Sequence, residues 1–304
     1  MASVRLFLLT SIFGWITEAA EPVSKGHLLI IGGGSQPVEV RRRFVELAGG
    51  PAKAKILLLP MASREPESAG LDELVAFQKI GATNVQLLIA SREQCSSPEI
   101  LSRLDRVSGV FFGGGDQTLL AHILVGTPVQ ERLKTLFRDG AVIGGTSAGA
   151  AILSQVMITG EEVSPRNASE KFTSIRQGNI VTAEGLGFIT NAVIDQHFIA
   201  RRRLNRLFSV VLERPQLLGV GIDESTAVVI NPDNTFEVLG ENSVMVLNAR
   251  GAGSIRSDPA GNLGGRAIQV DLLLRGDRFD LTRGVALKSS LLKRRSEPGS
   301  ALQE

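Results

Sequence analysis

The fold is decided by one stretch of the chain, Ala141-Val-Ile-Gly-Gly-Thr-Ser-Ala-Gly-Ala-Ala-Ile-Leu153. Its first three residues, Ala141 to Ile143, are apolar and of the kind that forms a buried strand. Two glycines follow, and a helical run from Ala150 to Leu153 comes directly after the next turn. We therefore predict a strand that passes through a sharp turn into a helix.

The same alternation extends on both sides of this stretch. We predict strands at 27–31, 55–59, 85–89, 110–112, 192–194 and 219–222, and helices at 38–47, 71–80, 117–136 (broken near Pro128) and 198–213. Strands that alternate with helices predict a mostly parallel central sheet with helices on both faces. Short β-branched runs between residues 227 and 270 predict C-terminal β-hairpins that close one sheet edge. Residues 161–179 are polar and turn-rich, and we interpret them as a loop. The expectation is one α/β domain over residues 25–290.

Composition excludes several classes of function. The chain has 304 residues, a formal charge of only +2 and no tyrosine, which does not suit a nucleic-acid binder that stacks bases on aromatic rings. Cys95 is the only cysteine, so neither an intrachain disulfide nor a cysteine zinc cluster is possible.

The two ends of the chain are expected to lie outside the domain. Arg5 precedes an apolar run from Leu6 to Ile16, and two small residues, Ala19 and Ala20, follow. This pattern predicts a signal peptide over residues 1–22, which is too short to span a membrane, and hence a secreted or periplasmic protein. The alternative is a wrongly assigned start or a disordered leader on a cytoplasmic protein. Residues 293–304 are predicted to be a disordered tail.

The turn around Ser147 carries the strongest chemical signal. Gly145-Thr-Ser-Ala-Gly149 has the G-x-S-x-G form in the strand–turn–helix context that a nucleophilic serine requires. The serine Oγ would project above the sheet, and the N–H of Ala148 would stabilise a developing oxyanion. The alternative is a glycine-rich turn that only packs a helix on a strand.

A nucleophilic serine needs a base and an acid that orients it. His27, His122 and His197 are the only histidines, and His197 alone follows a strand whose end carries polar residues. A second strand end supplies two candidate acids, Asp223 and Glu224. Residue types alone leave the choice between them open.

Two further glycine runs end predicted strands. Gly113-Gly114-Gly115 allows backbone N–H groups to approach a ligand, so that Gly114 or Gly115 would complete an oxyanion hole with Ala148. A nucleotide-binding turn is the alternative for this run and for Gly32-Gly-Gly34, but neither shows the lysine or the spacing of such a motif.

An arginine cluster follows His197. Arg201, Arg202, Arg203 and Arg206 crowd the start of a predicted helix, where positive charge opposes the helix dipole. Helix stability therefore does not explain them, whereas pairing with a ligand carboxylate does. The alternative is a solvated basic face.

Taken together, the strand-end motifs resemble those of the cyanophycinases, a family of serine peptidases. The motifs are Phe112-Gly-Gly-Gly-Asp-Gln117, Gly145-Thr-Ser-Ala-Gly-Ala150, Asp195-Gln-His-Phe198 and Gly221-Ile-Asp-Glu224, with Ala62-Ser-Arg-Glu-Pro66 after the second strand. The resemblance covers most of the chain, from Lys25 to Leu247. It implies an exopeptidase that hydrolyses cyanophycin, a poly-aspartate with arginine on each β-carboxyl, to β-Asp-Arg dipeptides through an acyl-enzyme.

The resemblance also implies a triad of Ser147, His197 and Glu224, which prefers Glu224 over Asp223. The implied fold is of the class I glutamine-amidotransferase type, which is flavodoxin-like. The implied substrate contacts are Gln117, Asp195, Gln196, Arg201, Arg203 and Arg206. A homodimer without metal or organic cofactor is expected.

Two segments depart from the family pattern. The first loop has the sequence Gly32-Gly-Gly-Ser-Gln-Pro37 where the family usually has Gly-Gly-Ala/Gly-Glu-Asp-Lys, and the segment from Glu161 to Gly178 matches no family motif. An α-aspartyl or isoaspartyl dipeptidase is therefore an alternative. A non-catalytic binding protein on the same scaffold is a second alternative, which the intact Ser147, His197 and Glu224 disfavour.

Overall fold

The computed structural model describes residues 24–163 and 171–288. A nine-stranded sheet runs through the molecule in the order β17-β16-β11-β10-β1-β5-β4-β2-β3. Its parallel half consists of β1 (Leu28–Ile31), β2 (Lys55–Leu59), β3 (Asn84–Leu87), β4 (Gly109–Phe112) and β5 (Val142–Thr146). Its antiparallel half consists of β10 (Thr226–Ile230), β11 (Thr235–Gly240), β16 (Arg278–Asp280) and β17 (Val285–Leu287).

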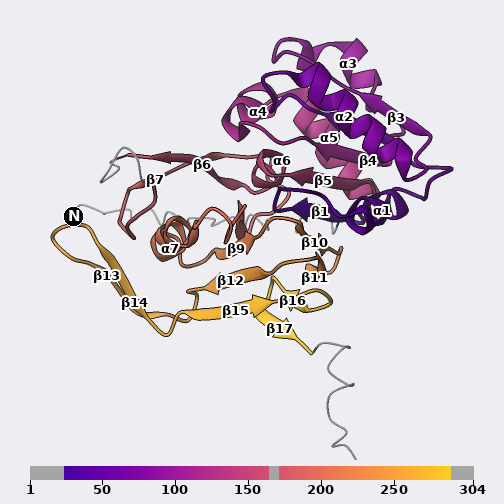
Figure 1. Ribbon diagram of the computed structural model, residues 1–304. Coiled ribbons are helices and arrows are strands. Elements are labelled where there is room, and N and C mark those ends of the chain that lie inside the picture. Colours follow the sequence, from indigo (N-terminus) through magenta and orange to yellow (C-terminus); the bar gives the residue numbers. More distant parts are fainter. Residues whose placement is uncertain (1–23, 164–170, 289–304) are drawn as a thin grey trace, which may run out of the picture.

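Helices cover both faces of the parallel half (Figure 1). α1 (Val38–Leu47) and α2 (Pro66–Lys79) lie on one face, where Phe44, Phe77 and Phe111 pack edge to face with ring centroids 5.3 to 5.6 Å apart. The other face carries α3 (Pro98–Ser102), α4 (Gln117–Leu124), α5 (Pro128–Asp139) and α6 (Ala148–Ala151), with a short 3-10 turn at Gln94–Ser96. Apolar side chains on both faces of the strands explain why these strands are continuous hydrophobic runs.

A second sheet of four strands packs on the same face as α6. Its order is β15-β12-β9-β8, from β8 (Ala192–Gln196), β9 (Leu218–Ile222), β12 (Val244–Asn248) and β15 (Gln269–Leu273). Side chains such as Ile194 and Val220 join the core of the large sheet, while α7 (Leu204–Glu213) covers the opposite face. The two sheets therefore share one hydrophobic core.

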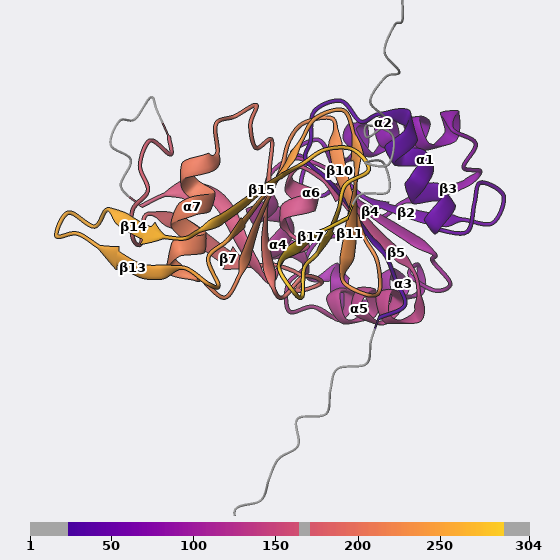
Figure 2. The same cartoon turned by 90° about the horizontal axis from the view of Figure 1, so that it is seen from below.

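Two hairpins project from this body. One is formed by β6 (Val156–Glu162) and β7 (Ile180–Glu184), and the other by β13 (Gly253–Ser257) and β14 (Leu263–Arg266). Figure 2 shows the second hairpin extending beyond α7, at the end of the molecule far from α1 and α2. No helix in the described part of the chain is long and apolar enough to cross a membrane.

The predicted fold class is confirmed, with local differences. The strands at 192–196 and 218–222 belong to the second sheet, because β8 pairs with β9 and β9 pairs with β12, and neither strand pairs with a strand of the large sheet. The helix predicted from Phe198 begins at Leu204, and Phe198 to Arg203 form a turn in which Arg202 has a φ of 53°. The predicted signal peptide and disordered tail lie outside the described residues.

Candidate active site

Ser147 occupies a strained turn between β5 and α6. Its φ of 53° and ψ of −113° are unusual for a residue with a side chain. A Cβ on Gly145 would overlap the carbonyl of Gly149, and a Cβ on Gly149 would overlap that of Phe112. The glycines are therefore required for helix–strand packing as well as for the turn, so the packing alternative and the nucleophile hypothesis are compatible.

Ser147, His197 and Glu224 form one chain of hydrogen bonds. Ser147 Oγ lies 2.8 Å from His197 Nε2, and His197 Nδ1 lies 2.6 Å from Glu224 Oε1. Because a carboxylate only accepts, Nδ1 carries the proton and Nε2 is free to accept the proton of the serine. The serine comes from the large sheet, whereas the histidine and the glutamate follow β8 and β9 of the second sheet.

The protonation state of His197 suits a base. Burial lowers the pKa of the imidazole below its usual value, while the hydrogen bond to Glu224 acts in the opposite direction. The positive charges of Arg201 and Arg203 lower the pKa further. A lowered pKa keeps the imidazole neutral at neutral pH, so its Nε2 lone pair is available to accept a proton.

The carboxylate of Asp223 accepts hydrogen bonds from the backbone, unlike that of its neighbour Glu224. Its Oδ1 accepts the backbone N–H groups of Ile199 at 3.2 Å and Ala200 at 3.0 Å. The carboxylate therefore holds the turn that follows His197, and Glu224 alone of the two contacts the imidazole. Of the two candidate acids, Glu224 is therefore the one placed to orient His197, and its catalytic role stays a prediction.

The first glycine loop supports the histidine and the glutamate, a relationship that sequence reasoning missed. Gly33 (φ 100°) lies so close to His197 that a Cβ there would overlap the ring. A Cβ on Gly34 (φ 69°) would lie 2.8 Å from the Cβ of Glu224. The N–H of His197 donates to the Gly32 carbonyl at 2.7 Å. The only sequence signal was the run of three glycines after the first strand, which had suggested a nucleotide-binding turn as an alternative.

The second glycine loop lies beside the serine. A Cβ on Gly114 would sit 3.5 Å from the Cβ of Ser147, and Gly115 (φ 140°) packs against the carbonyl of Ala62. Within residues 24–163 and 171–288, the N–H groups of Gly114, Gly115 and Ala148 donate to no protein acceptor. Asp116 then caps α4 by accepting from Thr118 at 2.7 Å.

Two predicted substrate contacts, Asp195 and Arg206, are buried against each other. Arg206 donates through Nε to Asp195 at 2.8 Å and through Nη2 to the second carboxylate oxygen, and both side chains are 1 % exposed or less. The guanidinium also stacks on the ring of Phe172 at 4.9 Å. In this structure the two residues form a buried ion pair, and the substrate contacts expected of them stay predictions.

Gln117 also has a structural partner. Its Nε2 donates to the carbonyls of Ile158 at 2.9 Å and Thr159 at 2.7 Å, so the side chain ties α4 to β6. The side chain is buried, and the substrate contact expected of it stays a prediction.

The remaining arginines lie at the turn after His197. Arg203 donates to the carbonyl of Gln196 at 2.7 Å, and burial next to Arg206 lowers the pKa of its guanidinium to about 10. The Gln196 side chain is buried beside Arg206, at 3.5 Å. Arg201 is the exposed one, with its Nε 3.9 Å from Glu224. Of the predicted substrate contacts, Arg201 therefore has the clearest access to solvent beside the triad.

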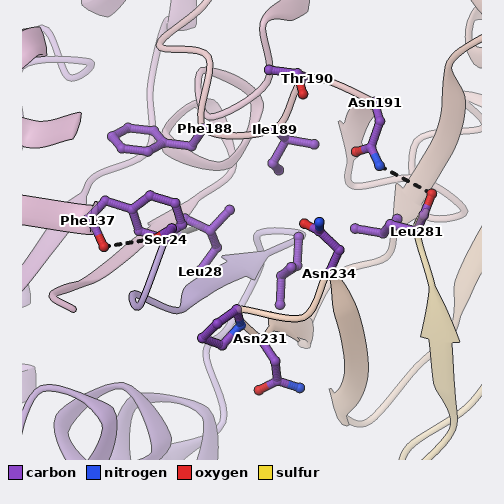
Figure 3. A pocket seen from close by; sticks show the side chains of 12 residues that line it. Ser24, Leu28, Phe137, Phe188, Ile189, Thr190, Asn191, Asn231, Asn234 and Leu281 are labelled. Carbon is purple, nitrogen blue, oxygen red and sulfur yellow. Dashed lines mark hydrogen bonds between the residues drawn. The ribbon is translucent and has the colours of Figure 1, made fainter. Parts of the chain in front are cut away.

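A pocket of about 310 Å³ lies elsewhere, at the amino end of β1 (Figure 3). It is lined by Leu28, Phe137, Asn191 and Asn234, among others, and Asn191 donates across it to the Leu281 carbonyl at 3.2 Å. The triad lies at the carboxyl end of β1, so this pocket is not part of the site. The described residues also contain no group of three or more acidic, histidine or cysteine side chains that would hold a metal.

An α/β fold in which a serine, a histidine and a carboxylate form one hydrogen-bonded chain has the arrangement of a serine hydrolase, a class that includes the serine peptidases. The chain belongs to peptidase family S51, whose sequence profile matches residues 28–238.

Curated relatives agree with this assignment. The cyanophycinase of Trichormus variabilis is 36% identical over 272 residues, covering 87% of this chain and 88% of the relative. The cyanophycinase of Synechococcus elongatus is 38% identical over 233 residues, covering 74% of this chain and 69% of the relative. A solved peptidase from an acI-B1 Actinobacterium superposes with a TM-score of 0.62 at 22% identity, over 86% of this chain and 98% of the other, and supports the fold.

Proposed function

We propose that the protein is a serine exopeptidase that hydrolyses cyanophycin, multi-L-arginyl-poly-L-aspartate, to β-Asp-Arg dipeptides. The observation that carries the proposal is the hydrogen-bonded chain from Ser147 through His197 to Glu224. The cyanophycinase relatives support the choice of substrate.

In the acylation step, Ser147 Oγ attacks the carbonyl carbon of the scissile bond. Its proton moves to His197 Nε2, and Glu224 stabilises the resulting imidazolium through Nδ1. The N–H groups of Gly114 and Ala148, with Gly115 beside them, stabilise the negative charge that develops on the carbonyl oxygen. The C–N bond then breaks, and His197 gives its proton to the leaving amine.

The acyl-enzyme is then hydrolysed by the same groups. A water molecule attacks the ester carbonyl while His197 Nε2 takes one of its protons. Collapse of the second tetrahedral intermediate breaks the bond to Ser147 Oγ, which recovers its proton from the imidazolium. The products are a β-Asp-Arg dipeptide and a polymer shortened by one unit, one with a new carboxylate and the other with a new amine.

Substrate recognition in this proposal uses the positive groups beside the triad. Arginine is suited to bidentate pairing with a carboxylate, and Arg201 is exposed next to Glu224. Arg203 adds a largely buried positive charge at the same turn. Each β-Asp-Arg unit carries a free carboxylate on its arginine, which these side chains would bind.

The test is release of β-Asp-Arg from purified cyanophycin by the wild-type chain and by Ser147→Ala. We expect release by the wild type and a loss of about a millionfold in kcat for the variant, because the nucleophile and its base act as a unit. A serine-reactive phosphonate should label the wild type only. Labelling without release of dipeptide would contradict the substrate and favour an α-aspartyl or isoaspartyl dipeptidase. The absence of labelling in a folded chain would contradict the enzyme itself.

Secretion and homodimer formation stay predictions. They would be tested by sequencing the amino terminus of the mature protein and by measuring its mass in solution.

A further inference from the structure

A groove leads away from the glycine loop beside Ser147. A depression of about 260 Å³ lies between Gly113-Gly114 and α2, and Arg41, Asp72 and Glu73 line it. A second depression of about 350 Å³ continues over α1 and α2. Because Arg41 and Asp72 line both, the two depressions form one continuous groove.

The groove begins at the nucleophile. Gly114 lines its inner end, and a Cβ on that residue would touch the Cβ of Ser147 at 3.5 Å. A substrate chain that passes over Gly114 therefore reaches the groove directly. Ser147, His197 and Arg201 line neither depression, so the two units that flank the cleaved bond would bind outside this groove.

The two carboxylates in the groove differ in whether a protein group compensates their negative charge. Glu73 accepts from Gln36 at 2.9 Å and lies 3.5 Å from Arg41, so its charge is compensated. Asp72 is exposed and has no hydrogen-bond or ion-pair partner within the described residues. One buried polar atom of the groove wall, Arg41 Nε, also lacks a partner in the described part of the chain.

The outer part of the groove is partly apolar. Val38 and Val75 are 53% and 44% exposed there, and Lys79 lies beside them. An arginine side chain matches such a surface, because its methylene stem packs on apolar groups while its guanidinium pairs with a carboxylate. A carboxylate on the same ligand would suit Lys79 and Arg41.

We propose that this groove is a binding subsite for one further unit of the polymer, beyond the two that flank the cleaved bond. The guanidinium of that unit pairs with Asp72, its stem lies on Val38 and Val75, and its carboxylate faces Arg41. The inference rests on the proposed function, because it names where a longer substrate chain continues. Binding of the further unit at this subsite gives the enzyme a higher kcat/KM for chains of three or more β-Asp-Arg units than for chains of two.

The test compares synthetic β-Asp-Arg chains of two and three units, with a three-unit chain in which the third arginine is replaced by neutral citrulline. Wild-type kcat/KM should be about two- to fivefold higher for arginine than for citrulline in the third unit, the size of a partly exposed ion pair. Asp72→Asn should abolish this preference and leave the two-unit chain unaffected. Glu67→Gln, which removes a carboxylate from the same helix outside the groove, should retain it.

A binding measurement separates this inference from the proposed activity. Ser147→Ala, with and without Asp72→Asn, is titrated by calorimetry with the two-unit chain and with both three-unit chains. An arginine preference that depends on Asp72 supports the subsite even if the wild type cleaves none of these chains. An equal preference with Asn at position 72, or an equal effect on the two-unit chain, overturns it.

Discussion

The backbone N–H of His197 donates to the carbonyl of Gly32 at 2.7 Å, and this bond joins the two sheets at the active site. Gly32 follows β1 of the large sheet, and His197 follows β8 of the second sheet. The N–H of Ser225 makes a similar bond to Gly33 at 2.9 Å. The glycine loop thereby sets the position of the imidazole relative to Ser147.

Gly33→Ala should reduce the catalytic activity strongly and the free energy of unfolding much less. The new Cβ would overlap the His197 ring and push it away from Ser147. We expect kcat to fall by at least about 100-fold, since small displacements in a catalytic group have effects of this size. Gly50→Ala is the matched control, because Gly50 also has a positive φ (87°) but has no atom within 4 Å of the added Cβ. Similar kinetics for both variants would contradict the proposed support of His197.

Glu224→Gln should reduce kcat by about 10² to 10⁴-fold, because an amide no longer stabilises the imidazolium and can favour the wrong tautomer. The side chain is partly exposed, so the unfolding midpoint should change little. Asp223→Asn keeps an oxygen that accepts from Ile199 and Ala200 and should have a far smaller effect. If Asp223→Asn were the more damaging of the two, the assignment of the third residue would be wrong.

The acid limb of kcat/KM should have its midpoint below pH 6.5. Burial lowers the pKa of His197, and the neutral imidazole is the active form, so activity is present above this pKa and is lost as pH falls through it. Arg201→Gln removes a positive charge that lowers the pKa, and the limb should therefore move to higher pH. Arg202→Gln is the control, because Arg202 does not act on the pKa of His197. A limb that moves equally in both variants would contradict this electrostatic account.

Asp195→Ala should destabilise the fold strongly. It leaves the Arg206 guanidinium buried without its carboxylate, a change that costs about 3 to 5 kcal/mol of the free energy of unfolding. The double variant Asp195→Leu with Arg206→Met should be less damaging, because it removes both charges. Denaturant unfolding of the three proteins measures the difference. If the double variant lost as much of the free energy of unfolding as the single variant, an unpaired buried charge would not be the cause of the loss.

Local signals predicted the parallel half of the fold well. Helix α1 and strand β2 have their predicted bounds, and the serine turn lies where the strand, glycines and helix required it. Helix α2 begins at Pro66, five residues before the predicted start, and proline is well suited to a first helical position.

Features that depend on distant partners were not predictable in the same way. The second sheet exists because β9 pairs with β12, which lies more than twenty residues further along the chain. The burial of Arg206 depends on Asp195, although its position four residues before Val210 placed it near the apolar face of α7. The substrate roles expected of these residues came from the family resemblance, and motif matching does not report that the two side chains are buried against each other.

Because the triad residues come from two different sheets, a shift between the sheets would inactivate the enzyme before either sheet unfolds. Ser147 and His197 meet only while the sheets keep their relative position, and the hydrogen bond of 2.8 Å between them fails with a shift of about one ångström. Heat or a mild denaturant that loosens the contact between the two sheets would therefore abolish catalysis while each sheet keeps its strands paired. We therefore expect the temperature at which activity is lost to depend on the packing between the two sheets more than on the stability of either sheet.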